Sequence, residues 1–165
     1  MRKAVLFCLS LVAAASLAAW SAAATDGLED GCLVIDSGRG IVTLSAKGFV
    51  FGRFDQGQLD IEDPVETDGA VKVFGYQKKR SISETKTRYI GAAVRFRASG
   101  LFRIRLEAVG MDVSLAGKGS ASLFADDFFD AGRYSIDAPS FCEKGFQPMP
   151  DVPVKVVVVG PPTTP

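Results

Sequence analysis

Four arginines alternate with apolar residues in two neighbouring stretches of the chain: Arg95, Arg97, Arg103 and Arg105. Successive side chains of a β-strand point to opposite faces, so the arginines share one face and the apolar residues share the other. A hairpin turn at residues 98–100 would set Arg95 directly opposite Arg103. Like charges in that position are unfavourable without a counter-charge. The pattern therefore predicts a nearby source of anions.

Two sources of anions fit this arginine face. One is an anionic partner, such as an envelope polymer or a glycan, because the planar guanidinium fork suits carboxylate and phosphate groups. The other is a neighbouring strand at residues 58–62, where Asp60 and Glu62 alternate with two apolar residues. Cross-strand ion pairs would then neutralise the arginines, as usually happens on solvated charged faces.

Missing residue types exclude several kinds of catalytic site. The chain has no His and no Asn, and its single Trp is Trp20. Without His there is no Ser-His-Asp or Cys-His machinery and no imidazole metal ligand. Partial matches to known motifs, such as Ser83–Lys86 and Asp126–Asp130, lack their required partner motifs. We expect no cofactor, no metal and no enzyme activity. The alternative is a hydrolase that uses two carboxylates, for which acids at residues 60–68 are candidates.

The first 24 residues have the features of a secretory signal peptide. Arg2 and Lys3 precede an apolar run from Ala4 to Trp20, and a small-residue ending follows before Thr25. Cleavage would leave no membrane span, whereas a retained anchor helix is the alternative. The pattern predicts a secreted or extracytoplasmic protein of the periplasm, cell envelope or extracellular space.

The charge and the cysteines of the exported part are informative. The chain has 19 basic and 19 acidic residues, and two of the basic ones lie in the signal segment, which leaves 17 − 19 = −2. This balance gives no indication of nucleic acid as a partner.

Cys32 and Cys142 lie near the two ends of this part and predict a disulfide bond. A redox or metal-binding pair is the alternative, although the spacing does not favour it.

Short apolar segments separated by Gly, Asp, Ser and Pro follow one another over residues 25–159. They predict a single all-β domain, an antiparallel sandwich or barrel of about ten strands. Residues 42–48 resemble residues 113–119, which raises the possibility of a duplicated β-unit. The Pro- and Thr-rich residues 160–165 form a tail.

Phe49 and Phe51 alternate on one side of a predicted strand at residues 49–54. We expect another element to bury them, because large aromatic residues usually lie inside a fold. An exposed patch that binds a partner or a second copy is the alternative. Taken together, the residues predict an exported, non-enzymatic binding or structural module, with a secreted carboxylate-dependent hydrolase as the alternative.

Overall fold

In the part of the chain that the structure describes, all regular elements are β-strands. The computed structural model describes residues 30–65, 67–126, 131–137 and 145–159. The strands are β1 (Gly31–Glu62), β2 (Val71–Phe74), β3 (Lys78–Ser81), β4 (Lys86–Ala125), β5 (Arg133–Asp137), β6 (Gln147–Pro148) and β7 (Val154–Val158). They form one antiparallel sheet that does not close on itself. The predicted all-β class is confirmed.

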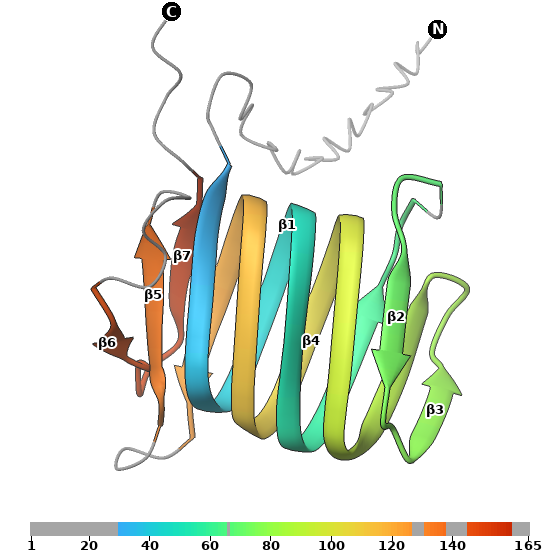
Figure 1. Ribbon diagram of the computed structural model, residues 1–165, viewed down its shortest axis with the longest axis horizontal. Helices are drawn as coiled ribbons and strands as arrows, with labels where there is room; N and C mark the ends of the chain where they lie inside the picture. Colours follow the sequence, from blue (N-terminus) through green and yellow to red (C-terminus); the bar gives the residue numbers. More distant parts are fainter. Residues whose placement is uncertain (1–29, 66, 127–130, 138–144, 160–165) are drawn as a thin grey trace, which may run out of the picture.

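The two long strands, β1 and β4, wind together as a coiled ribbon (Figure 1). Ile41 of β1 pairs with Glu107 on one side and with Phe124 on the other, which lies 124 − 107 = 17 residues further along β4. Ser45 pairs in the same way with Arg103 and Ser120. The ribbon therefore advances 17 residues per turn in each strand, and each turn is hydrogen-bonded to the next.

Glycines sit where the ribbon bends from one side of the coil to the other. In β1 these are Gly31, Gly40, Gly48 and Gly57, at intervals of about half a turn. Gly48 has a φ of 152° and pairs with both Gly100 and Gly117. A Cβ atom at Gly48 would lie 2.3 Å from the carbonyl oxygen of Ala116, so only glycine allows this approach.

The bends flatten the coil into two layers, seen as nearer and fainter ribbons in Figure 1. Layer A contains residues 31–40, 48–57, 91–100 and 108–117, together with β2, β5 and β6. Layer B contains residues 40–48, 57–62, 86–91, 100–108 and 117–125, together with β3 and β7. Alternate side chains of each layer point inward or outward.

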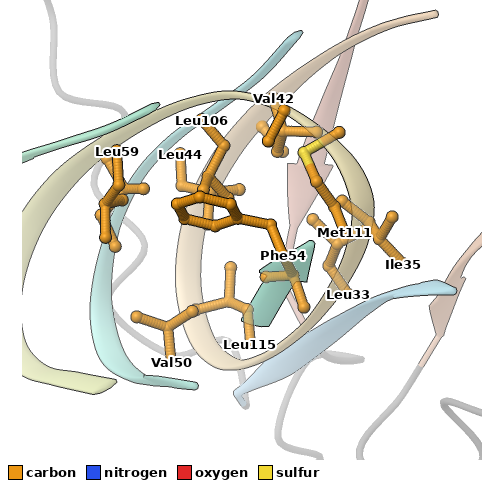
Figure 2. Close-up of a cluster of buried hydrophobic side chains, with 14 of the residues drawn as sticks. Leu33, Ile35, Val42, Leu44, Val50, Phe54, Leu59, Leu106, Met111 and Leu115 are labelled. Carbon is orange, nitrogen blue, oxygen red and sulfur yellow. The ribbon is translucent and has the colours of Figure 1, made fainter. Parts of the chain in front are cut away.

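The core fills the space between the two layers. Figure 2 shows Leu33, Leu44, Phe54 and Leu106 pointing into a turn of the ribbon, and all four are buried. These side chains come from alternate positions of β1 and β4, as expected for strands with one apolar face. Burial of apolar surface is the main force that holds the coil together, and it contributes about 25 cal/mol of free energy per Å² buried.

The predicted number of strands is wrong, although most strand positions are right. Four predicted segments merge into β1 and four into β4, so seven strands are found instead of about ten. A sandwich or barrel of ten separate strands is not confirmed. The predicted hairpin at residues 98–100 is also wrong, because the ribbon bends there and continues to pair with distant residues.

The similar segments at residues 42–48 and 113–119 lie in β1 and β4, respectively. Both segments run through the ribbon to a bend, and Gly48 and Gly117 are direct cross-strand partners there. Since Gly48 corresponds to Gly119 and not to Gly117 in the two similar segments, this pairing does not account for the likeness, and a duplicated β-unit stays a prediction.

Several predictions fall on residues outside the described ranges. These are the signal segment at residues 1–24, the tail at 160–165 and Cys142. Cys32 is buried in β1, and its bond to Cys142 stays a prediction. No helix long and apolar enough to cross a membrane occurs among the described residues.

Candidate functional site

The four arginines of the predicted ladder lie on two different layers of the molecule. Arg95 and Arg97 belong to layer A, and Arg103 and Arg105 belong to layer B, because the ribbon bends at Gly100 between them. Arg95 pairs across strands with Arg53 and Phe74, and Arg103 pairs with Ser45 and Glu62. The prediction that Arg95 and Arg103 face each other is wrong.

The two layer B arginines are neutralised by carboxylates. Arg103 Nη1 donates a hydrogen bond to Glu62 Oε1 over 3.0 Å, and Arg105 Nη2 lies 3.3 Å from Glu107 Oε2. These ion pairs are largely exposed, so each contributes less than about 1 kcal/mol to stability. For Arg103, the carboxylate comes from the strand at residues 58–62 that the sequence indicated as a source of anions.

Asp60, in the same part of β1, is held by a second group of cations. Arg88 donates two hydrogen bonds to its carboxylate, from Nε over 2.6 Å and from Nη2 over 2.8 Å. Lys86 Nζ lies 3.7 Å away. The Arg88 hydrogen bonds hold the pKa of Asp60 below its usual value, against the opposing effect of burial. Asp60 is therefore unsuited to donate a proton in catalysis.

The two layer A arginines have a different environment. Among the described residues, no carboxylate forms an ion pair with Arg95 or Arg97. Both line an open groove of about 760 Å³ on the outer side of layer A, between the rings of Phe51 and Phe74. We call this the cationic groove; it is lined by Phe51, Gly52, Arg53, Phe74, Arg95, Phe96, Arg97, Asp112 and Ser114.

Phenylalanine rings are exposed along this groove. Phe51 and Phe74 are 53% and 56% exposed, and Phe49, beside the groove, is 46% exposed. The Phe49 and Phe51 rings are in contact, with centroids 6.1 Å apart. The expectation that another element buries Phe49 and Phe51 is wrong, because they lie on the outer side of layer A. Exposed apolar patches of this kind are typical of binding surfaces.

One ion pair, between Arg53 and Asp112, lies in the wall of the groove. Arg53 Nε donates to Asp112 Oδ2 over 2.7 Å, and Asp112 Oδ1 accepts a hydrogen bond from the backbone N–H of Ser37. The Asp112 hydrogen bond raises the pKa of Arg53. Since both Asp112 oxygens are engaged, the unbalanced charges of the groove are those of Arg95 and Arg97.

Each exposed ring of the groove lies beside one of the two arginines on a neighbouring strand. Phe51 pairs across strands with Arg97, and Phe74 pairs with Arg95. Lys72, also exposed, pairs with Arg97 on its other side. Neighbouring strands are about 4.8 Å apart, so two cations and two rings lie within a few side-chain widths. The arrangement suits a ligand that has both anionic groups and apolar surface.

Sequence reasoning found Arg95 and Arg97 but missed Phe74 and the groove itself. Phe74 lies in β2, which has only four residues, and it reaches the groove through pairing with β4. The spacing of glycines in β1 was the signal that could have revealed the coil. Glycines that recur every half turn would have assigned residues 91–100 and 100–108 to different layers. Arg95 and Arg103 would then have been expected on different layers too.

The acidic residues proposed for a hydrolase do not form one site. Asp60 and Glu62 are bound by arginines, Glu66 lies outside the described ranges, and Asp68 accepts the N–H of Leu101. Asp63 lines a separate cavity of about 180 Å³ together with Glu84. Within the described ranges, no group of three or more Cys, Asp or Glu side chains is placed to hold a metal ion.

The chain matches no protein-family model, and neither a curated protein nor a solved structure is significantly similar to it.

Proposed function

We propose that this protein is an exported, non-enzymatic binding module of the cell envelope or extracellular space. Its contact surface is the cationic groove, and its partner is anionic. The observation that carries this proposal is the pair Arg95 and Arg97, which have no carboxylate partner among the described residues and lie between exposed rings. Arginines in such a position bind carboxylate, sulfate or phosphate groups through paired hydrogen bonds.

The contrast between the two layers supports this choice of surface. Arg103 and Arg105 resemble Arg95 and Arg97 in sequence context, yet each has an acidic neighbour within 3.3 Å. Arginines that serve only to solubilise a sheet are usually balanced in this way. The unbalanced pair is also the pair that lies beside exposed aromatic surface, where a partner gains both charge neutralisation and apolar burial.

The test is retention of the purified protein on envelope preparations across a salt titration. We expect strong retention at about 0.02 M salt and loss by about 0.3 M, because salt screens exposed charges. The double substitution R95S/R97S should abolish retention. R103S/R105S removes the same charge from the same strand but on layer B, and it should leave retention unchanged.

Three results would contradict the proposal. These are no retention at any salt concentration, equal loss in both double variants, or loss only in R103S/R105S. Circular dichroism of each variant checks that the coil remains folded. Since all four arginine side chains point outward, we expect little change in stability.

Export to an oxidising compartment and a Cys32–Cys142 bond belong to the same proposal. Cys32 is buried at the start of β1, where a disulfide bond would tie the first turn of the coil to the C-terminal region. The chain-entropy model gives a bond across about 100 residues a stabilisation of about 4 to 5 kcal/mol. The intact mass of the secreted protein before and after reduction tests both cleavage before Thr25 and the bond.

A carboxylate-dependent hydrolase remains the second candidate because of one observation. Asp63 and Glu84 line the same small cavity, and Asp63 Oδ1 is buried without a hydrogen bond from any described residue. The test is hydrolysis of a panel of glycoside substrates by the wild type and by D63N/E84Q. Activity lost in the variant would support this candidate, and the absence of activity in the wild type would dispose of it.

A further inference from the structure

The pattern of rings and charges in the cationic groove narrows the chemistry of its ligand. Phe51 of β1 and Phe74 of β2 lie on either side of the β4 segment that carries Arg95 and Arg97, and each ring is the cross-strand partner of one arginine. A single inorganic anion would bind the guanidinium groups and leave both rings in water. The ligand that covers the whole pattern alternates apolar faces with anionic groups.

We propose that this ligand is an acidic polysaccharide, with sugar rings packed on Phe51 and Phe74 and carboxylates bound by Arg95 and Arg97. A pyranose ring presents an apolar C–H face that packs against aromatic rings, and a uronic acid adds a carboxylate beside it. The Ser114 hydroxyl, in the wall of the groove, supplies a polar group for sugar hydroxyls. This inference rests on the proposed function, because it assumes that the groove is the contact surface.

The size of the groove fits a short stretch of such a chain. A volume of about 760 Å³ lies within the range of small-ligand sites, about 300 to 1,000 Å³. The groove extends over β2 and over segments of β4 and β1, so the polymer would cross the strands. Because the groove is open, the polymer can continue beyond it on either side.

Two other polyanions fit the groove less well. A single-stranded nucleic acid also has stacking rings and charges, but domains that bind it are usually strongly basic, and this chain has a pI of about 6.3. An anionic bilayer is a broad surface that contacts projecting side chains. Phe51 and Phe74 instead line a hollow.

The experiment measures binding of four probes to the full protein by fluorescence anisotropy. The probes are polygalacturonate oligomers, their fully methyl-esterified and uncharged form, vesicles of phosphatidylglycerol and phosphatidylcholine, and a single-stranded oligonucleotide. We expect polygalacturonate to bind with an affinity that falls steeply with salt. The methyl ester should bind at least about tenfold more weakly, because it cannot pair with the arginines.

Two double variants separate the contribution of the arginine charges to affinity from that of the phenylalanine rings. R95S/R97S should lose about tenfold or more in affinity for polygalacturonate. F51S/F74S should lose a similar factor, including at high salt, because stacking is not screened. R103S/R105S is the matched control and should stay within about twofold of the wild type.

Each outcome separates this inference from the proposed function. Binding of vesicles or oligonucleotide but not of polygalacturonate overturns the polysaccharide and leaves an anion-binding module. Unchanged affinity in F51S/F74S also overturns it, because the rings would then make no contact. Failure of all the charged probes, together with no envelope retention, overturns both proposals.

Discussion

At the scale of single residues, the neighbours of an arginine decide what it does. Arg88 is tied to Asp60 by two short hydrogen bonds and contributes to the fold. Arg103 meets Glu62 at the surface, where the pair has little effect on stability. Arg95 lies beside Phe74 and forms no ion pair with a described carboxylate, which is why we propose it as a contact for an anionic partner.

The Asp60 ion pair gives a prediction about stability. D60N should lower the free energy of unfolding by about 2 kcal/mol at pH 7, because it removes the anion that satisfies Arg88. Asp60 is 3% exposed, while the Arg88 side chain is 36% exposed, so water moderates the loss. Urea unfolding of wild type and variant measures this difference.

The same pair sets the pH dependence. Because the folded-state pKa of Asp60 is lowered from 3.8, its contribution is complete above that value and disappears as the pH falls through the folded-state pKa. The difference between wild type and D60N should therefore shrink as the pH falls below 3.8. The control E62Q alters an exposed pair and should cost well under about 1 kcal/mol. A D60N penalty no larger than that of E62Q would contradict this account.

At the scale of elements, glycine converts a straight ribbon into a coil. Gly48 and Gly117 are cross-strand partners with φ angles of 152° and 149°. Their backbones approach so closely that a Cβ on either glycine would lie 2.3 Å from a carbonyl oxygen of the other strand. The bend is thus set by two positions that tolerate no side chain.

Replacement of Gly48 by alanine tests this role. Gly48→Ala should cost roughly 3 kcal/mol, from the unfavourable φ and the clash with the Ala116 carbonyl. Gly145→Ala is the control, because Gly145 also has a positive φ but has no atom within 4 Å of an added Cβ. Its cost should be about 1 kcal/mol. Denaturant midpoints compare the two, and equal midpoints would show that the bend is not sterically restricted.

Which side chains point inward could be predicted from the sequence, but not how the strands connect. Phe96 and Phe102, which alternate with the arginines, are buried on the opposite face as the pattern predicts, since alternation within a strand is a local property. The hairpin proposed between them was wrong, because Gly100 marks a bend in a continuing ribbon. Pairing between residues such as Ile41 and Phe124 depends on distant parts of the chain, and the glycine spacing, which marks the bends, does not specify which residues pair.

At the scale of the whole molecule, the coil separates two outer surfaces with different charge environments. The outer side of layer B carries Arg88, Arg103 and Arg105 with nearby acids. The outer side of layer A carries the cationic groove and three exposed phenylalanines. Two copies that met through this groove would bring together two pairs of Arg95 and Arg97, for which no ion pair is formed among the described residues, and this is unfavourable.

This repulsion predicts the effect of neutralising the groove on self-association. The wild type should sediment as a monomer at low ionic strength. R95S/R97S should show a higher average mass at high protein concentration, because exposed rings remain once the repulsion is removed. Sedimentation velocity compares them with R103S/R105S. Association of the wild type that R95S/R97S abolishes would contradict this view of the surface.

The most direct test of the central claim is to find which layer an anionic partner contacts. NMR of the isotope-labelled protein, titrated with the tightest-binding anionic probe, reports this residue by residue. We expect the shifts to concentrate on layer A, at residues 49–53, 72–74 and 95–97. Shifts that concentrate on layer B, at residues 58–62 and 103–107, would contradict it.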